Sequence, residues 1–270
     1  MSNTHIICGD AHSRPGVSNR RFSWLGQFIL DYHLAHLDEE LIIIEMGDFE
    51  DMSSLSSYDI GKKCYEGRRY KADLACAWDA RKRVNAPTDR YNETRKRDHK
   101  SLFKPRKIAL GGNHFEQRIQ RVTESSPMLD GVISVADAKH ELYGWKYIPF
   151  LKPIVIDGIS YVHYWQGNGS AKPMGMGKYP AATVLREKHC SSVTGHNHVK
   201  DKAELLDGQG NRLIAISAGC FLDPDQYEDY AGQSNTTWWK GIIILKGVED
   251  GYPKGGYEEV PIEVLQRRYG

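Results

Sequence analysis

Five short segments of the chain carry aspartate, asparagine and histidine residues in patterns that could do chemistry. These segments are Gly9–His12, Gly47–Asp51, Gly111–His114, His163 alone and Gly195–His198. Carboxylate and amide oxygens bind hard divalent cations, and neutral imidazole nitrogens bind borderline metals. No cysteine stands in the five segments. The residue types therefore predict a metal site of oxygen and nitrogen ligands, suited to manganese, iron, zinc or magnesium.

A short apolar run accompanies each segment, as expected for a buried strand that ends there. The predicted strands are His5–Cys8, Leu41–Glu45, Lys107–Leu110, Ile159–Tyr164 and Cys190–Thr194. Helical spacing in Arg21–Leu37 and Phe115–Glu124 alternates with the first strands, which is typical of an α/β protein. Because open α/β sheets place their sites outside the carboxyl ends of the strands, we expect the five segments to meet at one edge.

The second half of the chain has the pattern of β-hairpins. Asp157-Gly158 separates Ile154–Ile156 from Ile159–Tyr164, and the turn Asp207–Gly210 separates Ala203–Leu206 from Arg212–Ser217. Turns of this type join antiparallel strands. We therefore expect a mixed sheet in this half.

One stretch of the chain is far more basic than the rest. Gly61–Lys107 holds 16 Lys and Arg but 6 Asp and Glu, whereas the whole chain has a formal net charge of only +1. We interpret residues 52–106 as a helical insertion in a single domain of residues 1–270. Tyr70, Leu74 and Trp78 indicate a first helix, and a second helix is predicted to begin near Thr88.

The charged runs of this stretch have two interpretations. They are a solvated helix face, or they bind a polyanionic substrate such as nucleic acid. The residues in question are Arg81, Lys82, Arg83, Arg95, Lys96 and Arg97.

The composition excludes several classes of protein. With 40% hydrophobic and 26% charged residues the chain matches folded proteins rather than disordered ones. No apolar run approaches the roughly 20 residues of a membrane span. The first residues lack the pattern of a secretory signal, and the five cysteines are scattered without CxxC pairs. We therefore expect a cytoplasmic protein that does not bind membranes; the sequence leaves the oligomeric state open.

The ordered motifs Asp-x-His, Gly-Asp-x-x-Asp, Gly-Asn-His, His and Gly-His-x-His, spread over residues 10–198, resemble the calcineurin-like metallophosphoesterase superfamily. The resemblance implies an αββα sandwich of two mixed sheets flanked by helices, with a dinuclear metal site. It implies that one metal is held by Asp10, His12, Asp48 and His198. The second would be held by Asp48, as the bridging ligand, with Asn113, His163 and His196. His114 would protonate the leaving group, and Asp51 would orient His114.

The chain departs from the family pattern at two places. Phe115 follows Gly-Asn-His, where an acidic residue is common, so that Glu116 comes one position late. Met52-Ser53 follows Asp51, where the Ser/Thr phosphatases have Arg-Gly. The second departure argues against that branch of the superfamily and leaves the substrate preference open.

The function implied by the resemblance is hydrolysis of a phosphoester by a metal-bridging hydroxide. We expect two divalent ions, manganese first, with iron, zinc or magnesium as alternatives. The basic stretch favours a phosphodiesterase or nuclease that acts on nucleotides or nucleic acid. The alternative is a phosphomonoesterase or pyrophosphohydrolase on a small molecule. From another class, the sequence also allows a nonhydrolytic nucleic-acid-binding protein.

Overall fold

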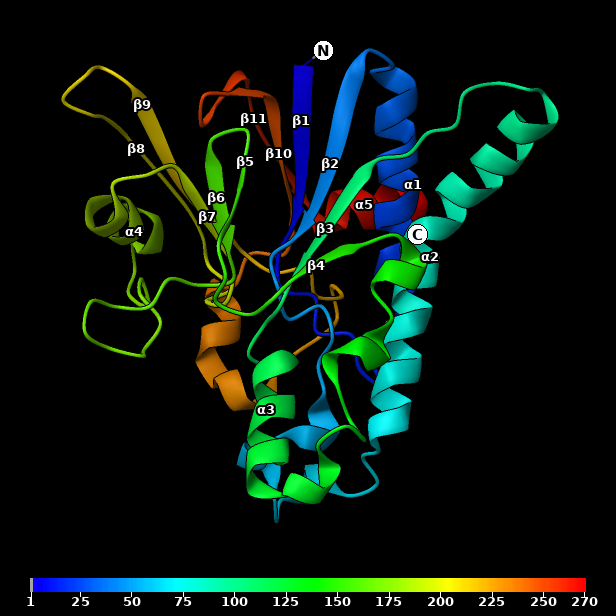
Figure 1. Ribbon diagram of the computed structural model, residues 1–270, viewed down its shortest axis with the longest axis vertical. Helices are drawn as coiled ribbons and strands as arrows, with labels where there is room; N and C mark the ends of the chain where they lie inside the picture. The colour runs from blue at the N-terminus through cyan, green and yellow to red at the C-terminus, as the bar shows by residue number, and fades with distance from the viewer. Residues whose placement is uncertain (1) are drawn as a thin grey trace.

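The computed structural model describes residues 2–270 and contains two mixed β-sheets with helices on their outer faces (Figure 1). The larger sheet has the strand order β11 (Tyr252–Pro261), β10 (Gly241–Glu249), β1 (Ser2–Cys8), β2 (Glu39–Glu45), β3 (Arg106–Leu110) and β4 (Lys146–Ile148). Strands β1 to β4 run parallel, whereas β10 is antiparallel to both of its neighbours. The α/β class predicted from the sequence is therefore confirmed.

The smaller sheet has the order β5 (Ile154–Ile156), β6 (Ile159–Val162), β7 (Ser192–Thr194), β9 (Arg212–Ala218) and β8 (Lys200–Leu206). Its centre, β6, β7 and β9, is parallel. Both predicted hairpins are confirmed, because β5 pairs with β6 and β8 pairs with β9 in antiparallel register. Two mixed sheets result, as expected.

The core has two layers because successive side chains of a strand point to opposite faces. In β2, Ile42 and Ile44 pack between the two sheets, whereas Leu41 and Ile43 pack under the helices. Both faces of this strand are covered, which explains why its sequence is apolar at consecutive positions rather than at alternate ones. A buried hydrogen bond of 2.6 Å between His5 of β1 and Tyr161 of β6 also joins the two sheets.

Helices cover the outer face of each sheet (Figure 1). Residues of α1 (Arg20–Ala35), α2 (Tyr70–Arg97) and α5 (Ile262–Tyr269) pack in the core on the larger sheet. Residues of α4 (Pro180–Lys188) pack on the smaller sheet. Helix α3 (Glu116–Ser125) lies beyond the ends of the strands. Among the helices of residues 2–270, none is long and apolar enough to cross a lipid bilayer.

Short 3-10 helices complete the described chain. They are η1 (Ser53–Leu55), η2 (Ser57–Asp59), η3 (Lys63–Tyr65), η4 (Pro127–Leu129), η5 (Val135–Ala138), η6 (Glu141–Tyr143) and η7 (Asp229–Thr237). The first three lie between β2 and α2, directly after the Gly47–Asp51 segment.

The prediction of two helices in the basic stretch is wrong, because one helix runs from Tyr70 to Arg97 with Pro87 inside it. Proline has no N–H, so the carbonyl of Arg83 loses its helical partner at this point. Gly26 of α1 lies directly against the carbonyl oxygens of Arg83 and Val84. Close packing against α1 thus holds both halves of α2 in one helix, where local sequence signals favour a break.

Helix α2 is the crossover between the parallel strands β2 and β3. A crossover must carry the chain from the carboxyl end of one strand back to the amino end of the next. The basic end of α2 therefore lies at the opposite edge of the sheet from Gly47–Asp51. Of the predicted insertion at 52–106, only residues 52–69, which precede α2, lie at the edge where the strands end. The single domain of residues 1–270 stays a prediction.

Arg81 is not available to bind a substrate, contrary to the expectation from the sequence. Its side chain is 0% exposed and donates to Glu50 at 2.6 Å and to Glu45 at 3.1 Å. Its guanidinium also lies 4.3 Å from the ring centre of Phe49. Burial raises the pKa of Glu45 to about 8 despite the pull of Arg81. Burial also favours a higher pKa at Glu50, but the interactions of Glu50 with Arg81 and His140 outweigh it and lower the pKa of Glu50 to about 2.

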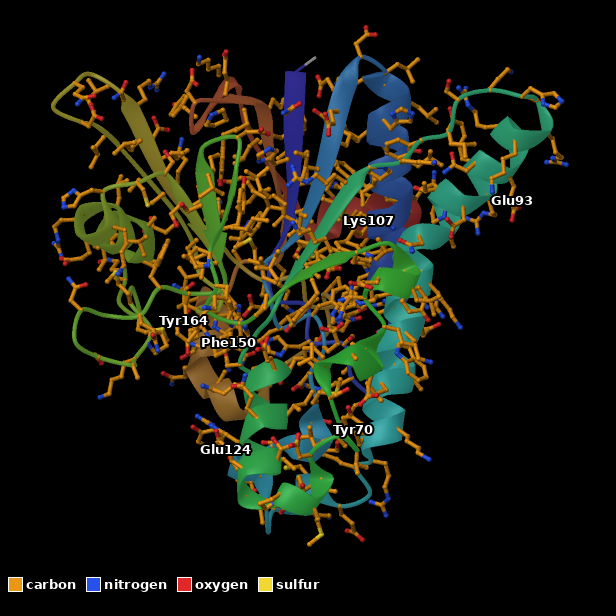
Figure 2. All side chains as sticks on the ribbon, viewed as in Figure 1. Tyr70, Glu93, Lys107, Glu124, Phe150 and Tyr164 are labelled. Carbon is orange, nitrogen blue, oxygen red and sulfur yellow. The ribbon has the colours of Figure 1, made fainter. Side chains whose placement is uncertain are left out.

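The other residues of the basic runs are largely exposed. Arg83 pairs with Asp79 at 2.7 Å on the surface of α2. The triplet Arg95–Arg97 forms the last turn of α2, next to the segment that enters β3. Figure 2 shows Glu93, in the same part of the helix, far from Tyr164 at the strand ends. The basic triplet does not border the predicted metal site.

We predict that Arg81→Ala destabilises the protein by about 3–5 kcal/mol, because it leaves Glu45 buried without its partner and Glu50 with His140 alone. The matched control is Arg83→Ala, two residues along the same helix, whose exposed ion pair contributes less than about 1 kcal/mol. Urea denaturation followed by circular dichroism measures both changes. Equal stability of the two variants would contradict this account of Arg81.

Candidate metal centre

The carboxyl ends of strands from both sheets bring the predicted site residues together. The turn after β1 carries Asp10 and His12, and the turn after β2 carries Asp48. The remaining residues follow β3 (Asn113 and His114), β6 (His163) and β7 (His196 and His198). All of the residues proposed as ligands from the sequence, and His114, lie in one connected cluster at this edge.

A first group consists of Asp10, His12 and His198, all buried. The Nε2 atom of His198 lies 3.2 Å from Oδ2 of Asp10 and 3.2 Å from Nε2 of His12. The ligand atoms of the three residues lie within 4.8 Å of one another. One cation could contact all three side chains.

A second group consists of Asp48, His163 and His196. The Nε2 atom of His163 lies 3.3 Å from Oδ2 of Asp48 and 2.9 Å from Oδ1 of Asn113. The ligand atoms of Asp48, His12 and His114 also lie within 4.8 Å of one another. Its carboxylate therefore lies between the two groups of ligands.

Backbone groups orient the carboxylates and one of the imidazoles. The N–H of His196 donates to both carboxylate oxygens of Asp10 at 3.0 Å, and the N–H of His114 donates to Oδ1 of Asp48 at 2.7 Å. The Nδ1 atom of His163 lies 2.8 Å from the carbonyl oxygen of Met46. A proton on Nδ1 donates to that carbonyl and leaves Nε2 free to bind a metal.

Two glycines allow the loops to approach these carboxylates. Gly112 lies against Asp48 so closely that an added Cβ would overlap its Oδ1 atom, and Gly195 stands in the same relation to Oδ1 of Asp10. Both glycines belong to the Gly-Asn-His and Gly-His-x-His motifs. They therefore make room for the ligands and supply none themselves.

Four of the site residues have a strained backbone. The φ angle is +45° at His12, +49° at Asp48, +72° at His196 and +58° at His198. Residues other than glycine rarely adopt this left-handed backbone conformation, and each one that does costs about 1–3 kcal/mol of folding free energy. Backbone strain that is concentrated at four neighbouring residues of one cluster is typical of a functional site.

The electrostatics of the cluster favour bound positive charge. Burial, with help from neighbouring imidazoles, lowers the pKa of His12 and lowers that of His196 to about 4. Burial acts the same way on His163, but Asp48 and Asp10 outweigh it and raise its pKa to about 9. Burial would raise the pKa of both carboxyls, yet His163 and its neighbours hold them low. The two carboxylates thus keep their negative charge and attract a cation.

The donor set fits a divalent metal. It offers buried carboxylates, an amide oxygen and several imidazoles. Nδ1 of His198 is buried and has no hydrogen-bond partner within the described part of the chain. The nearby thiols are unsuited, because burial and the neighbouring carboxylates raise the pKa values of Cys8 and Cys220. The cluster could therefore hold a metal ion through oxygen and nitrogen atoms.

Asp51 contacts His114, as the sequence led us to expect, with 3.0 Å between its Oδ1 and Nδ1 of His114. Two arginines that the sequence analysis missed also bind this carboxylate, Arg118 at 2.6 Å and Arg14 at 3.1 Å. Burial opposes the charge of Asp51, but His114 and Arg118 hold its pKa well below the usual range. Arg118 stands one helical turn after His114, a spacing that could have revealed it.

Aromatic residues flank the cluster. The ring of Tyr164 lies 4.6 Å from that of His196, and the ring of Trp238 lies edge-on at 4.2 Å from that of His198. The sequence analysis did not identify Trp238 as a residue of the site. Its position beside a proposed ligand could not be found from local pattern alone.

We predict that Gly112→Ala and Gly195→Ala weaken Mn²⁺ binding at least about tenfold, because each new methyl group displaces a carboxylate from its position. Gly208→Ala, in an open hairpin turn, is the matched control and should bind Mn²⁺ as the parent does. Isothermal titration calorimetry measures the affinities, and circular dichroism checks the fold. Unchanged affinity in both site variants would show that the two glycines do not position the ligands.

Comparison with models of known protein families and with curated proteins finds no match for this chain. The interpretation of the cluster therefore depends on the motifs in the sequence and on the geometry of the residues that carry them.

Proposed function

We propose that the protein is a dinuclear metal-dependent phosphoesterase of the calcineurin-like metallophosphoesterase superfamily, acting on phosphodiesters. The observation that carries the proposal is the position of the Asp48 carboxylate between two groups of largely buried ligands. The order of the five motifs supports it, as does the arrangement of two mixed sheets between layers of helices. In this proposal the first metal is held by Asp10, His12, Asp48 and His198, and the second by Asp48, Asn113, His163 and His196.

We take manganese as the first candidate, with iron, zinc and magnesium as alternatives. The carboxylate and amide oxygens suit manganese and magnesium, and the imidazoles suit iron and zinc. Two divalent cations, when bound, lower the pKa of a water between them and offset the charge of the phosphoryl oxygens. The protein's part is to hold the carboxylates of Asp10 and Asp48 as anions in fixed positions. The backbone N–H groups of His196 and His114 do this.

His114 is the candidate proton donor to the leaving oxygen. Asp51 accepts a hydrogen bond from its Nδ1 and thereby fixes the ring, while Nε2 is left for the substrate. Arg118 and Arg14 keep Asp51 ionised, and Arg14 is held in turn by Glu228 at 2.7 Å. These residues position His114.

The size of the adjoining cleft favours a diester over a small monoester. A cleft of about 1160 Å³ begins at Asn113, His114 and His196. Pockets for a single small molecule usually hold about 300–1000 Å³. The space is sufficient for groups on both sides of a phosphodiester.

We predict that Asp48→Asn reduces Mn²⁺-dependent hydrolysis to background, because the bridging carboxylate that offsets the repulsion between two cations is lost. Asp225→Asn is the matched control, since that side chain is 82% exposed and outside the cluster. The assay compares bis-p-nitrophenyl phosphate with p-nitrophenyl phosphate, cyclic nucleotides, single-stranded DNA and duplex DNA. We expect the parent to prefer the diester.

Hydrolysis that survives in Asp48→Asn, or in protein stripped with EDTA, would exclude the dinuclear mechanism. Preference for p-nitrophenyl phosphate would favour a monoesterase instead. Nucleic-acid binding without hydrolysis of any substrate would favour a binding protein.

We also predict that His114→Gln slows cleavage of a nucleoside phosphodiester by about 10²-fold or more, because the alkoxide leaving group needs a proton. Cleavage of bis-p-nitrophenyl phosphate should fall much less, since nitrophenolate leaves as a stable anion. Values of kcat for both substrates, at saturating Mn²⁺, provide the comparison. Equal losses on the two substrates would show that His114 does not act as the proton donor.

A further inference from the structure

The cleft next to the metal centre is lined by several separate parts of the chain, and three of them form walls that carry cations. One wall is the 53–73 segment, another is α3, and the third is the loop around Lys172 between β6 and α4. On α3 and the turn before it, His114, Gln117, Arg118 and Arg121 all line the cleft. Their spacing of three, four and seven residues places them on one helical face. This wall therefore leads from the proposed proton donor toward cationic side chains.

Several cations of the cleft are neutralised within the protein. Arg118 binds Asp51, and Arg68 and Lys62 both bind Asp59 at 2.8–3.0 Å. These pairs shape the walls and leave little charge for a ligand.

Three other cations in the cleft have no carboxylate within ion-pair distance among the side chains that the structure describes. They are Arg69 just before α2, Arg121 on α3, and Lys172 on the third wall. One exposed carboxylate, Glu66, shares the cleft with them. Each of the three cations comes from a different wall. A small anion bound at the metals could therefore not pair with all three of them. A chain of phosphates is a ligand that offers several anions along one groove.

Exposed tyrosines line the same cleft. Tyr58 is 74% exposed and Tyr227 is 57% exposed, although both rings are largely apolar. Aromatic rings beside cations are typical of grooves for single-stranded nucleic acid, because every base has a face that stacks. A duplex keeps its bases stacked inside and cannot use such rings.

On the basis of the proposed function, we propose that this cleft binds single-stranded nucleic acid across the metal centre. Phosphates that flank the scissile one contact Arg69, Arg121 and Lys172, and unstacked bases lie on Tyr58 and Tyr227. The substrate class is an oligonucleotide rather than a mononucleotide.

The chain offers a matched control for the charge. Arg95, Lys96 and Arg97 carry the same charge as the three cleft cations, but they lie at the far end of α2. Changing either set to glutamine alters the net charge equally. A difference between the two triple variants therefore reports on position and not on total charge.

The first measurement is binding without catalysis. Fluorescence anisotropy in EDTA follows a labelled oligothymidylate of about 12 nucleotides, within the range of sites in such grooves. The cleft variant Arg69→Gln/Arg121→Gln/Lys172→Gln should bind at least about tenfold more weakly, and the slope of log affinity against log salt should fall by about 2. The far-edge variant Arg95→Gln/Lys96→Gln/Arg97→Gln should stay within about twofold of the parent.

The second measurement tests the rings. Tyr58→Ala/Tyr227→Ala should weaken binding of the single strand by about fivefold or more. Tyr179→Ala, equally exposed but outside the cleft, should not. Tighter binding of a duplex of equal length would overturn the choice of a single strand.

The third measurement links the cleft to turnover with Mn²⁺. The ratio of kcat/KM for the oligonucleotide to kcat/KM for bis-p-nitrophenyl phosphate should fall at least about tenfold in the cleft variant and stay constant in the far-edge variant. Equal weakening by the two triple variants, or no weakening by the cleft variant, would overturn the inference. Oligonucleotide binding that depends on the cleft, without hydrolysis of any substrate, would refute the proposed function and leave the inference standing.

Discussion

The rest of the site depends on keeping the Asp48 carboxylate charged while it is buried. Water cannot stabilise this anion, so the protein must do so with fixed groups. The N–H of His114 donates to the carboxylate, His163 lies beside it, and Gly112 leaves room for it. The same loop is anchored by its main chain, because the carbonyl of Asp48 accepts from the N–H of His12 at 2.8 Å. Three other motifs therefore meet at Asp48. The segment with Gly112 and His114 and the single His163 contact its carboxylate, and the segment with His12 contacts its backbone carbonyl.

Much of the fold and of the candidate site could be predicted because both depend on local signals. Buried strands such as Leu41–Glu45 are apolar throughout, and the glycine after them marks where the chain must turn beside a ligand. Whether a charged side chain is exposed or buried cannot be predicted from such local signals. Arg81 has the sequence of a surface charge run, and only the packing of α2 on β2 places it between Glu45 and Glu50. Pro87 likewise predicts a helix break that contact with Gly26 overrides. The triplet at Arg95–Arg97 could be recognised as basic, but its distance from the site depends on the direction of the crossover.

The distribution of charge follows from this topology. A helix that joins parallel strands begins at the edge where ligands gather and ends at the other. Arg69, next to its start, can therefore serve the cleft, whereas Arg97 at its end cannot. Between these positions Arg81 is used to neutralise carboxylates inside the protein. A single basic stretch in the sequence thus divides into residues with three different surroundings, which net charge alone does not distinguish.

The start of α2 is tied to the loop that follows Asp51. Asp73, in the first turn of the helix, accepts from the hydroxyl of Ser53 at 3.1 Å and from the N–H of Ser54 at 2.9 Å. Two turns later, Arg81 binds Glu50 on the other side of Asp51. The chain on both sides of Asp51 is thereby clamped to one rigid helix. A ligand that enters the cleft meets a wall whose conformational entropy was already lost when the protein folded, so little of its binding energy is consumed in ordering that wall.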